Sequence, residues 1–342
     1  MMSTIQDVAK HAGISIATVS RALNNPDKVS TETRERVMEA VRQLEYYPNE
    51  KAKLLSSKTK EISVGIIIPY ISSYYFGELY KGISRTAKAQ NVRIVLHELH
   101  DESGEQSLMD ALTFCKQQGV SGILLSSQFV EKDYDLAISR LKLPVVLVLA
   151  HHESAMLPAF KIDDIKASFD AVSYLVTRGH KRIGIISGSL SNPVVGEPRY
   201  IGAKNAIDFY QLPFHDKQLV SGGIRFEDGY KAMNELLAAR DITGITAVFT
   251  ATDELAFGAM KRVRDAGLRV PEDISVIGFD NLSISGMFSP GLTTVSQPFA
   301  DIGVEGVNHL IQAIKNPAEM KPGTYYLPYN IVERESVAQT SD

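Results

Sequence analysis

The feature that most constrains the fold is a series of short, continuous apolar runs after Glu61. Amphipathic segments of helix length separate most of these runs. A strand that is apolar along its whole length is buried on both faces, which is typical of a parallel sheet covered by helices. The sequence therefore predicts an α/β fold with a doubly wound body. Its predicted strands are residues 64–68, 94–96, 122–125, 145–149, 183–186, 247–250 and 275–278.

This body is long. The chain has 342 residues, most of them after Glu61, and 44% of its residues are hydrophobic. One doubly wound sheet usually needs fewer residues, so we expect two lobes, each with its own core.

The first 48 residues have a different pattern, which predicts three short helices between Thr4 and Leu44. Gly13 separates the first two helices, and a breaker at residues 24–27 separates the second from the third. Pro48 must end the third helix. We therefore expect a helical head at residues 1–48, a polar linker at residues 49–60 and the body at residues 61–338.

Charge is distributed unevenly between head and body. Residues 1–60 contain 10 Lys and Arg against 7 Asp and Glu, whereas the rest of the chain contains 26 against 33. The partner of the head is therefore expected to be more anionic than the partner of the body.

The two helices around Gly13 have the small packing residues and polar second helix of a helix-turn-helix that binds DNA. Ile16 and Ala17 open the second helix and can pack on base methyl groups, while Arg21 can reach a guanine edge with two donors. Hydroxyl and amide side chains nearby can hold phosphates, namely Thr18, Ser20, Asn24 and Thr33.

The head resembles that of the LacI (lactose repressor) family at many positions. In that family the linker forms a hinge helix on DNA, and a Leu from each subunit enters the minor groove; Leu55 stands at that position here. Lys53 stands where many members have Arg. The matching positions are Thr4-Ile5-x-Asp7-Val8-Ala9, Ser15-x-x-Thr18-Val19-Ser20-Arg21-x-Leu23-Asn24, Val29-Ser30-x-x-Thr33-Arg34 and Tyr46-x-Pro48-Asn49. The predicted DNA-binding residues are Thr4, Ser15, Ile16, Ala17, Thr18, Ser20, Arg21, Asn24, Lys28, Thr33, Asn49, Lys53 and Leu55.

The body resembles the periplasmic-binding-protein-like core of the same family. The resemblance runs through residues 64–69, 122–125, 178–183, 252–256, 271–281 and 292–298. It implies an N-lobe at residues 61–160 and 291–320, a C-lobe at residues 161–290 and 321–338, and an effector between the lobes. The tail after Ser336 has no Leu heptads for a tetramerising helix, so the resemblance implies a homodimer on a near-palindromic operator.

Aromatic and acidic residues at the predicted pocket suit a sugar, because rings stack on its C–H face and carboxylates accept its hydroxyls. Two positions depart from sugar-binding members, which often have Arg at Glu197 and Asp at Leu149. The predicted effector-binding residues are Tyr70, Ser72, Ser73, Tyr74, Tyr75, Phe76, Ser126, Phe160, Arg199, Thr252, Asp253, Asp280 and Gln297.

The chain is also similar to the catabolite control protein A branch of the family, whose corepressor is the serine-phosphorylated phosphocarrier HPr. That branch binds the phosphate with an Arg and a Lys, whereas this chain has Asn308 and Gln312. We therefore expect a sugar or sugar phosphate as effector of a repressor of carbohydrate-utilisation genes. The alternative is a global catabolite regulator with a phosphoprotein corepressor.

Other functional classes fit less well. The sequence contains no phosphate-binding Gly-Lys-Ser/Thr loop, no Gly-x-Ser-x-Gly elbow and no His-Glu-x-x-His pair, so we expect no enzyme, cofactor or metal. The adjacent His151 and His152 predict a solvated loop, and Cys115 predicts a buried, inert thiol. Because no signal segment and no membrane-spanning run is found, we expect a cytoplasmic protein without a membrane partner.

Overall fold

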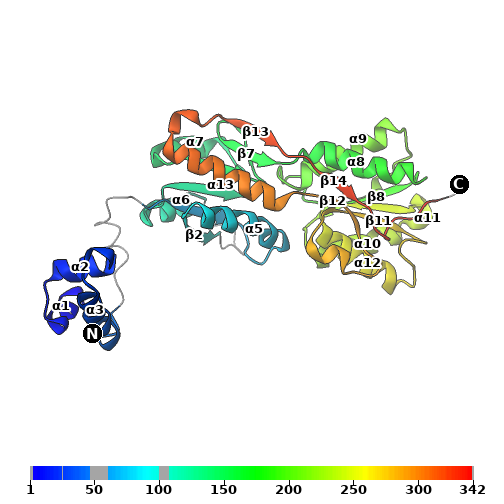
Figure 1. Cartoon of the computed structure of the whole chain (residues 1–342). Helices are drawn as coiled ribbons and strands as arrows, with labels where there is room; N and C mark the ends of the chain where they lie inside the picture. Colours follow the sequence, from blue (N-terminus) through cyan, green and yellow to red (C-terminus); the bar gives the residue numbers. More distant parts are fainter. Residues whose placement is uncertain (1–2, 25, 47–60, 100–107, 341–342) are drawn as a thin grey trace. The chain divides into compact units, whose positions relative to one another are not determined.

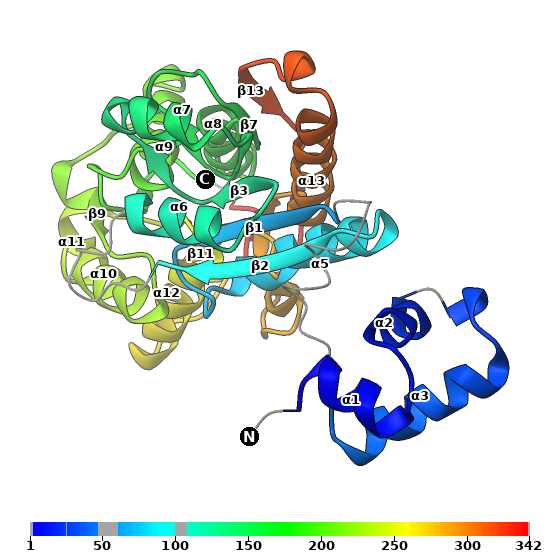
Figure 2. The same ribbon diagram turned by 90° about the vertical axis from the view of Figure 1, so that its left-hand side faces the viewer.

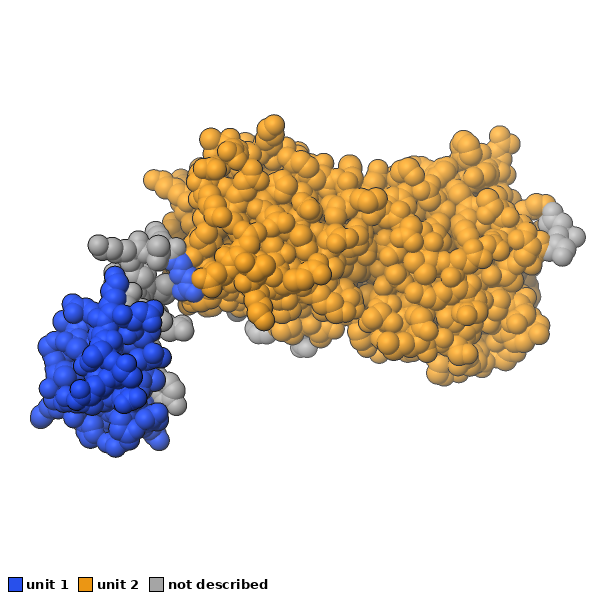
Figure 3. Space-filling model, viewed as in Figure 1, with its two compact units in different colours: residues 1–61 blue, residues 62–342 orange. Residues whose placement is uncertain are grey.

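The computed structural model describes residues 3–24, 26–46, 61–99 and 108–340. The chain forms two compact units, residues 1–61 and residues 62–342 (Figure 3). In the described part of the chain, no helix combines the length and the apolar character that crossing a membrane requires.

The first unit contains the three predicted helices. They are α1 (Ile5–Ala12), α2 (Ile16–Asn24) and α3 (Thr31–Gln43), with a short 3-10 turn η1 (Pro26–Lys28) between the last two. The fully buried side chains of Val8, Val19 and Val37, one from each helix, form the centre of the core.

The N-lobe of the second unit is built on a six-stranded sheet in the order β13-β7-β5-β3-β1-β2. Every neighbouring pair is parallel, as the continuous apolar runs predict. The strands are β1 (Ser63–Ile68), β2 (Arg93–Glu98), β3 (Gly122–Ser126), β5 (Val145–Val148), β7 (Pro158–Lys161) and β13 (Gly323–Tyr326).

Helices cover both faces of this sheet (Figure 2). Ile66 packs on one face with α5 (Tyr74–Ala89) and α13 (Phe299–Lys315). The adjacent Ile67 packs on the other face with α6 (Leu108–Gln117) and α7 (Asp135–Leu141). Alternate side chains of one strand therefore enter two different cores, which is why the whole strand is apolar.

The C-lobe has a second six-stranded sheet in the order β14-β12-β11-β10-β8-β9, parallel except for β14. Its strands are β8 (Ile183–Gly188), β9 (Leu219–Gly222), β10 (Ala247–Thr250), β11 (Ser275–Asp280), β12 (Thr293–Ser296) and β14 (Asn330–Val332). Its helices are α8 (Asp164–Thr177), α9 (Gly196–Phe209), α10 (Phe226–Ala238), α11 (Arg240–Thr243) and α12 (Asp253–Asp265). The short elements elsewhere are β4 (Phe129–Val130), β6 (His151–His152), η2 (Lys132–Tyr134), η3 (Asp216–Gln218), η4 (Ser283–Gly286) and η5 (Pro317–Glu319).

The chain passes between the lobes after β7, after β12 and after β13 (Figure 1). The predicted lobe boundaries are therefore wrong for two strands. β12 pairs with β11 in the C-lobe sheet, and β13 pairs with β7 in the N-lobe sheet. The physical reason is that each strand first completes its hydrogen bonds with its sheet, so the chain crosses only beyond the end of that strand.

Two single-residue predictions have different outcomes. His152 does not lie in a solvated loop, because its ring is buried and its Nε2 lies 2.6 Å from Asp135 Oδ1. Cys115 is buried as predicted, and burial raises the pKa of its thiol to about 11. The thiolate, which is the reactive form, is therefore scarce at neutral pH.

Candidate functional site

The helix-turn-helix in the first unit is held by local hydrogen bonds. At the start of α1 the Asp7 amide donates to Thr4 Oγ1 and the Thr4 amide donates to Asp7 Oδ2, which forms a capping box. α1 ends at Gly13, whose φ of 64° lies in the left-handed region that glycine adopts readily. Ser15 and Thr18 hydroxyls lie 2.8 Å apart at the start of α2.

The second helix exposes the side chains that we predict to contact bases. Ile16 is 45% exposed, and Ala17 and Arg21 are also exposed. Ala17 and Arg21 are four residues apart and therefore share one side of α2. An apolar residue exposed at the start of a helix, one turn from an exposed arginine, is compatible with the predicted contacts to base methyl groups and a guanine edge.

The other predicted DNA contacts lie around these positions. Thr4, Ser15 and Lys28 are exposed, and Thr18, Ser20 and Thr33 are half-buried. The side chain of Asn24 and all of Asn49, Lys53 and Leu55 lie outside the described residues. The predicted hinge contacts therefore stay predictions.

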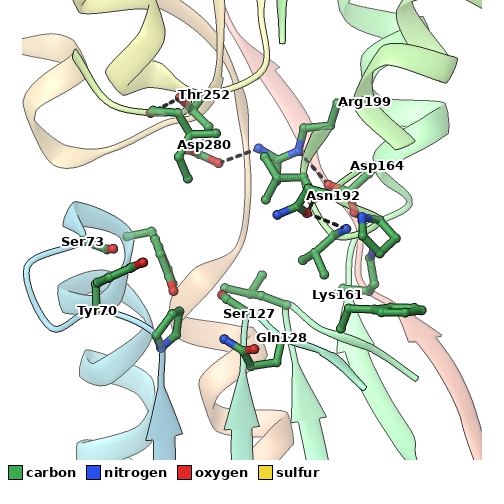
Figure 4. A pocket seen from close by; sticks show the side chains of 18 of the residues that line it. Tyr70, Ser73, Ser127, Gln128, Lys161, Asp164, Asn192, Arg199, Thr252 and Asp280 are labelled. Atoms are coloured by element: carbon green, nitrogen blue, oxygen red, sulfur yellow. Dashed lines mark hydrogen bonds and ion pairs between the residues drawn. The ribbon is translucent and has the colours of Figure 1, made fainter. Parts of the chain in front are cut away.

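The second unit contains a cavity of about 680 Å³ between its lobes (Figure 4). Residues that follow the carboxyl ends of strands in both sheets line it, which is where doubly wound sheets bind ligands. A cavity of this volume is in the range of small-molecule sites. Its lining is Pro69, Tyr70, Ser73, Tyr75, Ser127, Gln128, Phe129, Glu131, Leu149, Lys161, Asp164, Ser189, Ser191, Asn192, Pro193, Val194, Val195, Arg199, Ile224, Arg225, Thr252, Glu254, Asp280, Leu282, Gln297 and Phe299.

Arg199 is the central charged group of the cavity. Its Nε donates to Asp164 Oδ1 at 2.9 Å, and its Nη1 donates to the carbonyl of Ala251 at 2.6 Å and lies 3.5 Å from Asp280 Oδ1. Its guanidinium also lies 3.9 Å from the ring centroid of Phe279. These contacts hold the guanidinium in one place, and only about 5% of the residue is exposed.

The two carboxyl groups beside Arg199 differ in protonation. Burial raises the pKa of Asp280 to about 7 in spite of the nearby guanidinium, and Gln297 Nε2 donates to its Oδ1 at 2.7 Å. Burial also acts to raise the pKa of Asp164, but the charges of Arg199 and Lys161 outweigh it and hold that pKa below its ordinary value. Asp164 is therefore a fixed anion, whereas Asp280 changes charge near neutral pH.

Several predicted effector residues line the cavity. They come from the loop after β1, the start of α5, α9, the end of β11, and the loops after β10 and β12. The residues are Tyr70, Ser73, Tyr75, Arg199, Thr252, Asp280 and Gln297. The Tyr75 hydroxyl is buried and lies beside the side chains of Ser126 and Ser127.

Six predicted effector residues do not line the cavity, and this corrects the sequence analysis. Ser72 and Tyr74 are exposed to solvent, and Phe76 and Ser126 are buried, with Ser126 Oγ 3.3 Å from Oγ of the lining residue Ser127. Phe160 packs in the core, where its ring stacks on the Tyr325 ring with 5.0 Å between the two ring centroids. The sixth residue is Asp253.

Asp253 has a structural role and does not line the cavity. It is fully buried and accepts hydrogen bonds from Ser285 Oγ at 2.5 Å, Thr294 Oγ1 at 2.6 Å and the Leu282 amide at 2.9 Å. With these acceptor sites occupied, its side chain fixes the loop after β11 against β12.

Sequence reasoning missed a second set of charged lining residues: Glu131, Lys161, Asp164, Arg225 and Glu254. The sequence did contain a signal for Lys161 and Asp164. Lys161 ends a short strand that is otherwise apolar, and Asp163 and Asp164 follow this strand closely. Polar residues directly after a buried strand are candidates for a ligand site.

The chain matches the models of two protein families. Residues 4–49 match the description "Bacterial regulatory proteins, lacI family", and residues 172–337 match "Periplasmic binding protein-like domain".

Curated relatives match almost the full length. The chain is 35% identical to catabolite control protein A of Priestia megaterium over 98% of this chain and 99% of the relative. It is also 35% identical to the HTH-type transcriptional repressor CytR of Escherichia coli (strain K12), over 92% of this chain and 90% of the relative.

Solved structures agree with this similarity. A lac repressor dimer bound to operator and the anti-inducer ONPF has a TM-score of 0.83 and 26% identity, over 99% of this chain and 100% of that chain. The complex of the transcriptional regulator CelR with cellobiose has a TM-score of 0.72 and 26% identity, over 98% of this chain and 99% of that chain.

Proposed function

The chain belongs to the LacI family of bacterial regulatory proteins, and from this premise we propose that it is a dimeric repressor of carbohydrate-utilisation genes, controlled by a sugar or sugar phosphate. The observation that supports this most directly is the joining of two parts in one chain. A helix-turn-helix with exposed Ile16, Ala17 and Arg21 precedes a two-lobed body with a ligand-sized cavity. The first part binds DNA, and the second can sense a small molecule.

Operator binding follows from the head. Two identical heads in a dimer bind two half-sites of a near-palindromic operator in the cytoplasm, where the bacterial chromosome lies. Ile16, Ala17 and Arg21 set the half-site preference, while Lys28 adds attraction that does not depend on sequence. Leu55 inserts between base pairs at the centre of the operator.

Control by ligand follows from the cavity. Its lining comes from both lobes, so a ligand that binds it changes the relative stability of different lobe arrangements. The relatives include a regulator solved with cellobiose, which supports a sugar as the class of effector. Ligand binding then favours or opposes the arrangement in which the linkers of the dimer bind the operator.

A phosphoprotein corepressor is the weaker alternative. On α13, Asn308 accepts a hydrogen bond from Gln90 at 2.8 Å and Gln312 donates to Glu319 at 2.8 Å. Neither side chain carries a positive charge for a phosphate. Tight binding of HPr that depends on its serine phosphate would favour this alternative.

The first test measures DNA binding by the full chain. An operator is selected from random duplex DNA, and binding of Arg21→Ala and Lys28→Ala is then compared on that operator and on variants of it. Arg21→Ala should weaken operator binding by about 1–3 kcal/mol and relax the preference at one base pair. Lys28→Ala should weaken binding to all sequences about equally and lower the salt dependence. The reverse pattern, or no selection of a preferred sequence, would contradict the proposal.

A further inference from the structure

The charged side chains that line the cavity are almost completely paired with one another. Among the described lining residues the cations are Lys161, Arg199 and Arg225, and the carboxylates are Glu131, Asp164, Glu254 and Asp280. With all four ionised, the lining has one more carboxylate than cations, and with Asp280 protonated the numbers are equal. Whether a ligand meets a free cation depends on how these groups are paired.

Four of them form a buried ladder. Lys161 Nζ lies 2.8 Å from Asp164 Oδ2, Asp164 Oδ1 accepts from Arg199 Nε at 2.9 Å, and Arg199 Nη1 lies 3.5 Å from Asp280 Oδ1. Each of these four side chains is at most 11% exposed. At this depth a cation without a carboxylate would be costly, so each charge depends on its neighbour in the ladder.

Arg225, the third cation, is also paired with a carboxylate. Arg225 Nη1 lies 3.4 Å from Glu254 Oε1, and its guanidinium lies 5.4 Å from the ring centroid of Tyr70. No cation in the described lining is therefore without a carboxylate partner, and Glu131 adds a further negative charge.

Backbone amides are the other donors that bind anions, and most helix starts at the cavity already use theirs. Asp163 accepts the Lys166 amide in α8, and Thr252 accepts the Leu255 amide in α12. Asn192 accepts the amides that precede α9. The starts of α5 at Ser73 and of α10 at Arg225 have no side-chain cap. Arg225 is paired with Glu254, so neither start combines free amides with an unpaired cation among the described residues, and each is a weak site for a phosphate.

A phosphate ester carries about −1.5 to −2 charges at pH 7. In this cavity every cation of the described lining already has a carboxylate partner, so the phosphate could gain a cation only by competing with Asp164, Asp280 or Glu254 for it. An uncharged polyol keeps the ladder intact and uses its hydroxyls as donors to carboxylates. We propose that the cavity takes an uncharged sugar or related polyol and rejects its phosphate ester. This inference rests on the proposed function of the cavity as the effector site.

Titration calorimetry on the full-length protein can test this with matched pairs. The probes are glucose with glucose 6-phosphate, ribose with ribose 5-phosphate, and cellobiose with cellobiose 6-phosphate. Wherever the neutral member binds, we expect its phosphate ester to bind at least tenfold more weakly. A phosphate ester that binds as tightly as its neutral partner, or more tightly, would overturn the inference and leave the sensing function in place.

A different outcome identifies failure of the proposed function. If the protein binds its selected operator but none of these probes, then control by a sugar is contradicted, and the inference about ligand charge falls with it. Operator binding by the same preparation shows that the protein is folded.

A charge variant makes the test sharper. Asp164→Asn leaves Lys161 and Arg199 with Asp280 as the remaining ladder carboxylate, so the cavity gains a free cation. We expect the ratio of neutral-sugar to phosphate-ester affinity to fall at least tenfold. Asp170→Asn is the matched control, because Asp170 lies on the same helix, pairs with Lys166 at 2.6 Å and does not line the cavity.

The control should keep the wild-type ratio. If Asp164→Asn does not fold, Lys161→Gln replaces it with the opposite expectation, because losing a cation should weaken phosphate binding further. An unchanged ratio in a folded Asp164→Asn or Lys161→Gln protein would contradict the role of the ladder.

Discussion

At the scale of single residues, two buried aspartates of the C-lobe have different tasks. Asp253 accepts three hydrogen bonds from other segments of the chain and does not line the cavity. Asp280 faces the cavity and is held by Gln297 and Arg199. Both were predicted to contact the effector, but only Asp280 lies in the lining.

Replacement of Asp253 should therefore affect stability. Asp253→Ala leaves three donors without an acceptor, which should lower the free energy of unfolding by on the order of 3 kcal/mol. Urea denaturation of the full chain measures this. Asp265→Ala is the control, because it removes an exposed carboxylate that pairs with Lys261, and its midpoint should stay near that of the wild type. Equal midpoints for the two variants would contradict the structural role of Asp253.

Asp280 should make stability depend on pH. Burial raises its pKa to about 7 in the folded protein. Between its unfolded value near 4 and pH 7, the folded state binds more protons than the unfolded state, so stability falls as the pH rises through this window. Asp280→Asn cannot titrate and should lose less stability between pH 5 and pH 8. Parallel pH profiles of the unfolding free energy for wild type and variant would show that Asp280 does not titrate there.

At the scale of elements, the N-lobe depends on a close approach of α5 and α13. A Cβ added to Gly82 would lie 1.8 Å from the carbonyl oxygen of Ala300, and one added to Gly303 would lie 2.5 Å from the carbonyl oxygen of Leu79. Backbone from the partner helix therefore occupies the space where a side chain would begin. These two glycines allow the helices to pack together on one face of the sheet.

This packing predicts opposite outcomes for two glycines of the same helix. Gly82→Ala should destabilise the protein by about 2–3 kcal/mol, because backbone atoms must move apart. Gly77→Ala meets nothing within 4 Å and should be neutral or stabilise by up to ~1 kcal/mol, since alanine favours a helix. Thermal unfolding of both variants gives the comparison. A Gly82→Ala protein as stable as Gly77→Ala would mean that the helices are not in close contact.

At the scale of the whole molecule, the proposed control by a ligand requires that binding at the cavity and binding at the head are coupled in free energy. The lobes contribute facing sides of the cavity, and three chain segments connect them. A ligand changes operator affinity only to the extent that it binds the DNA-bound and free states differently.

This coupling has to be reciprocal. If a sugar that binds the cavity changes operator affinity tenfold, then operator DNA must change the affinity for that sugar tenfold in the same direction. Calorimetric titration of the sugar into protein with and without a selected operator measures how much the operator changes the sugar affinity. This factor is then compared with the change in operator affinity that the sugar causes. An effect of the sugar on DNA binding without the matching effect of DNA on sugar binding would show that the sugar acts elsewhere.

The sequence by itself determined the three helices of the head and the buried strands β1, β2, β3, β5, β8, β10 and β11, but it did not mark β7, β9, β12, β13 or β14. A strand covered on both faces must be apolar throughout, and a helix-turn-helix is built from contacts close along the chain, so both leave a local pattern. The tertiary structure alone decided which charges meet in the cavity and which sheet takes β12 and β13. Arg199 lies 35 residues from Asp164 and 81 from Asp280. No local pattern records pairs that only the packing of α8, α9 and β11 within the C-lobe brings together.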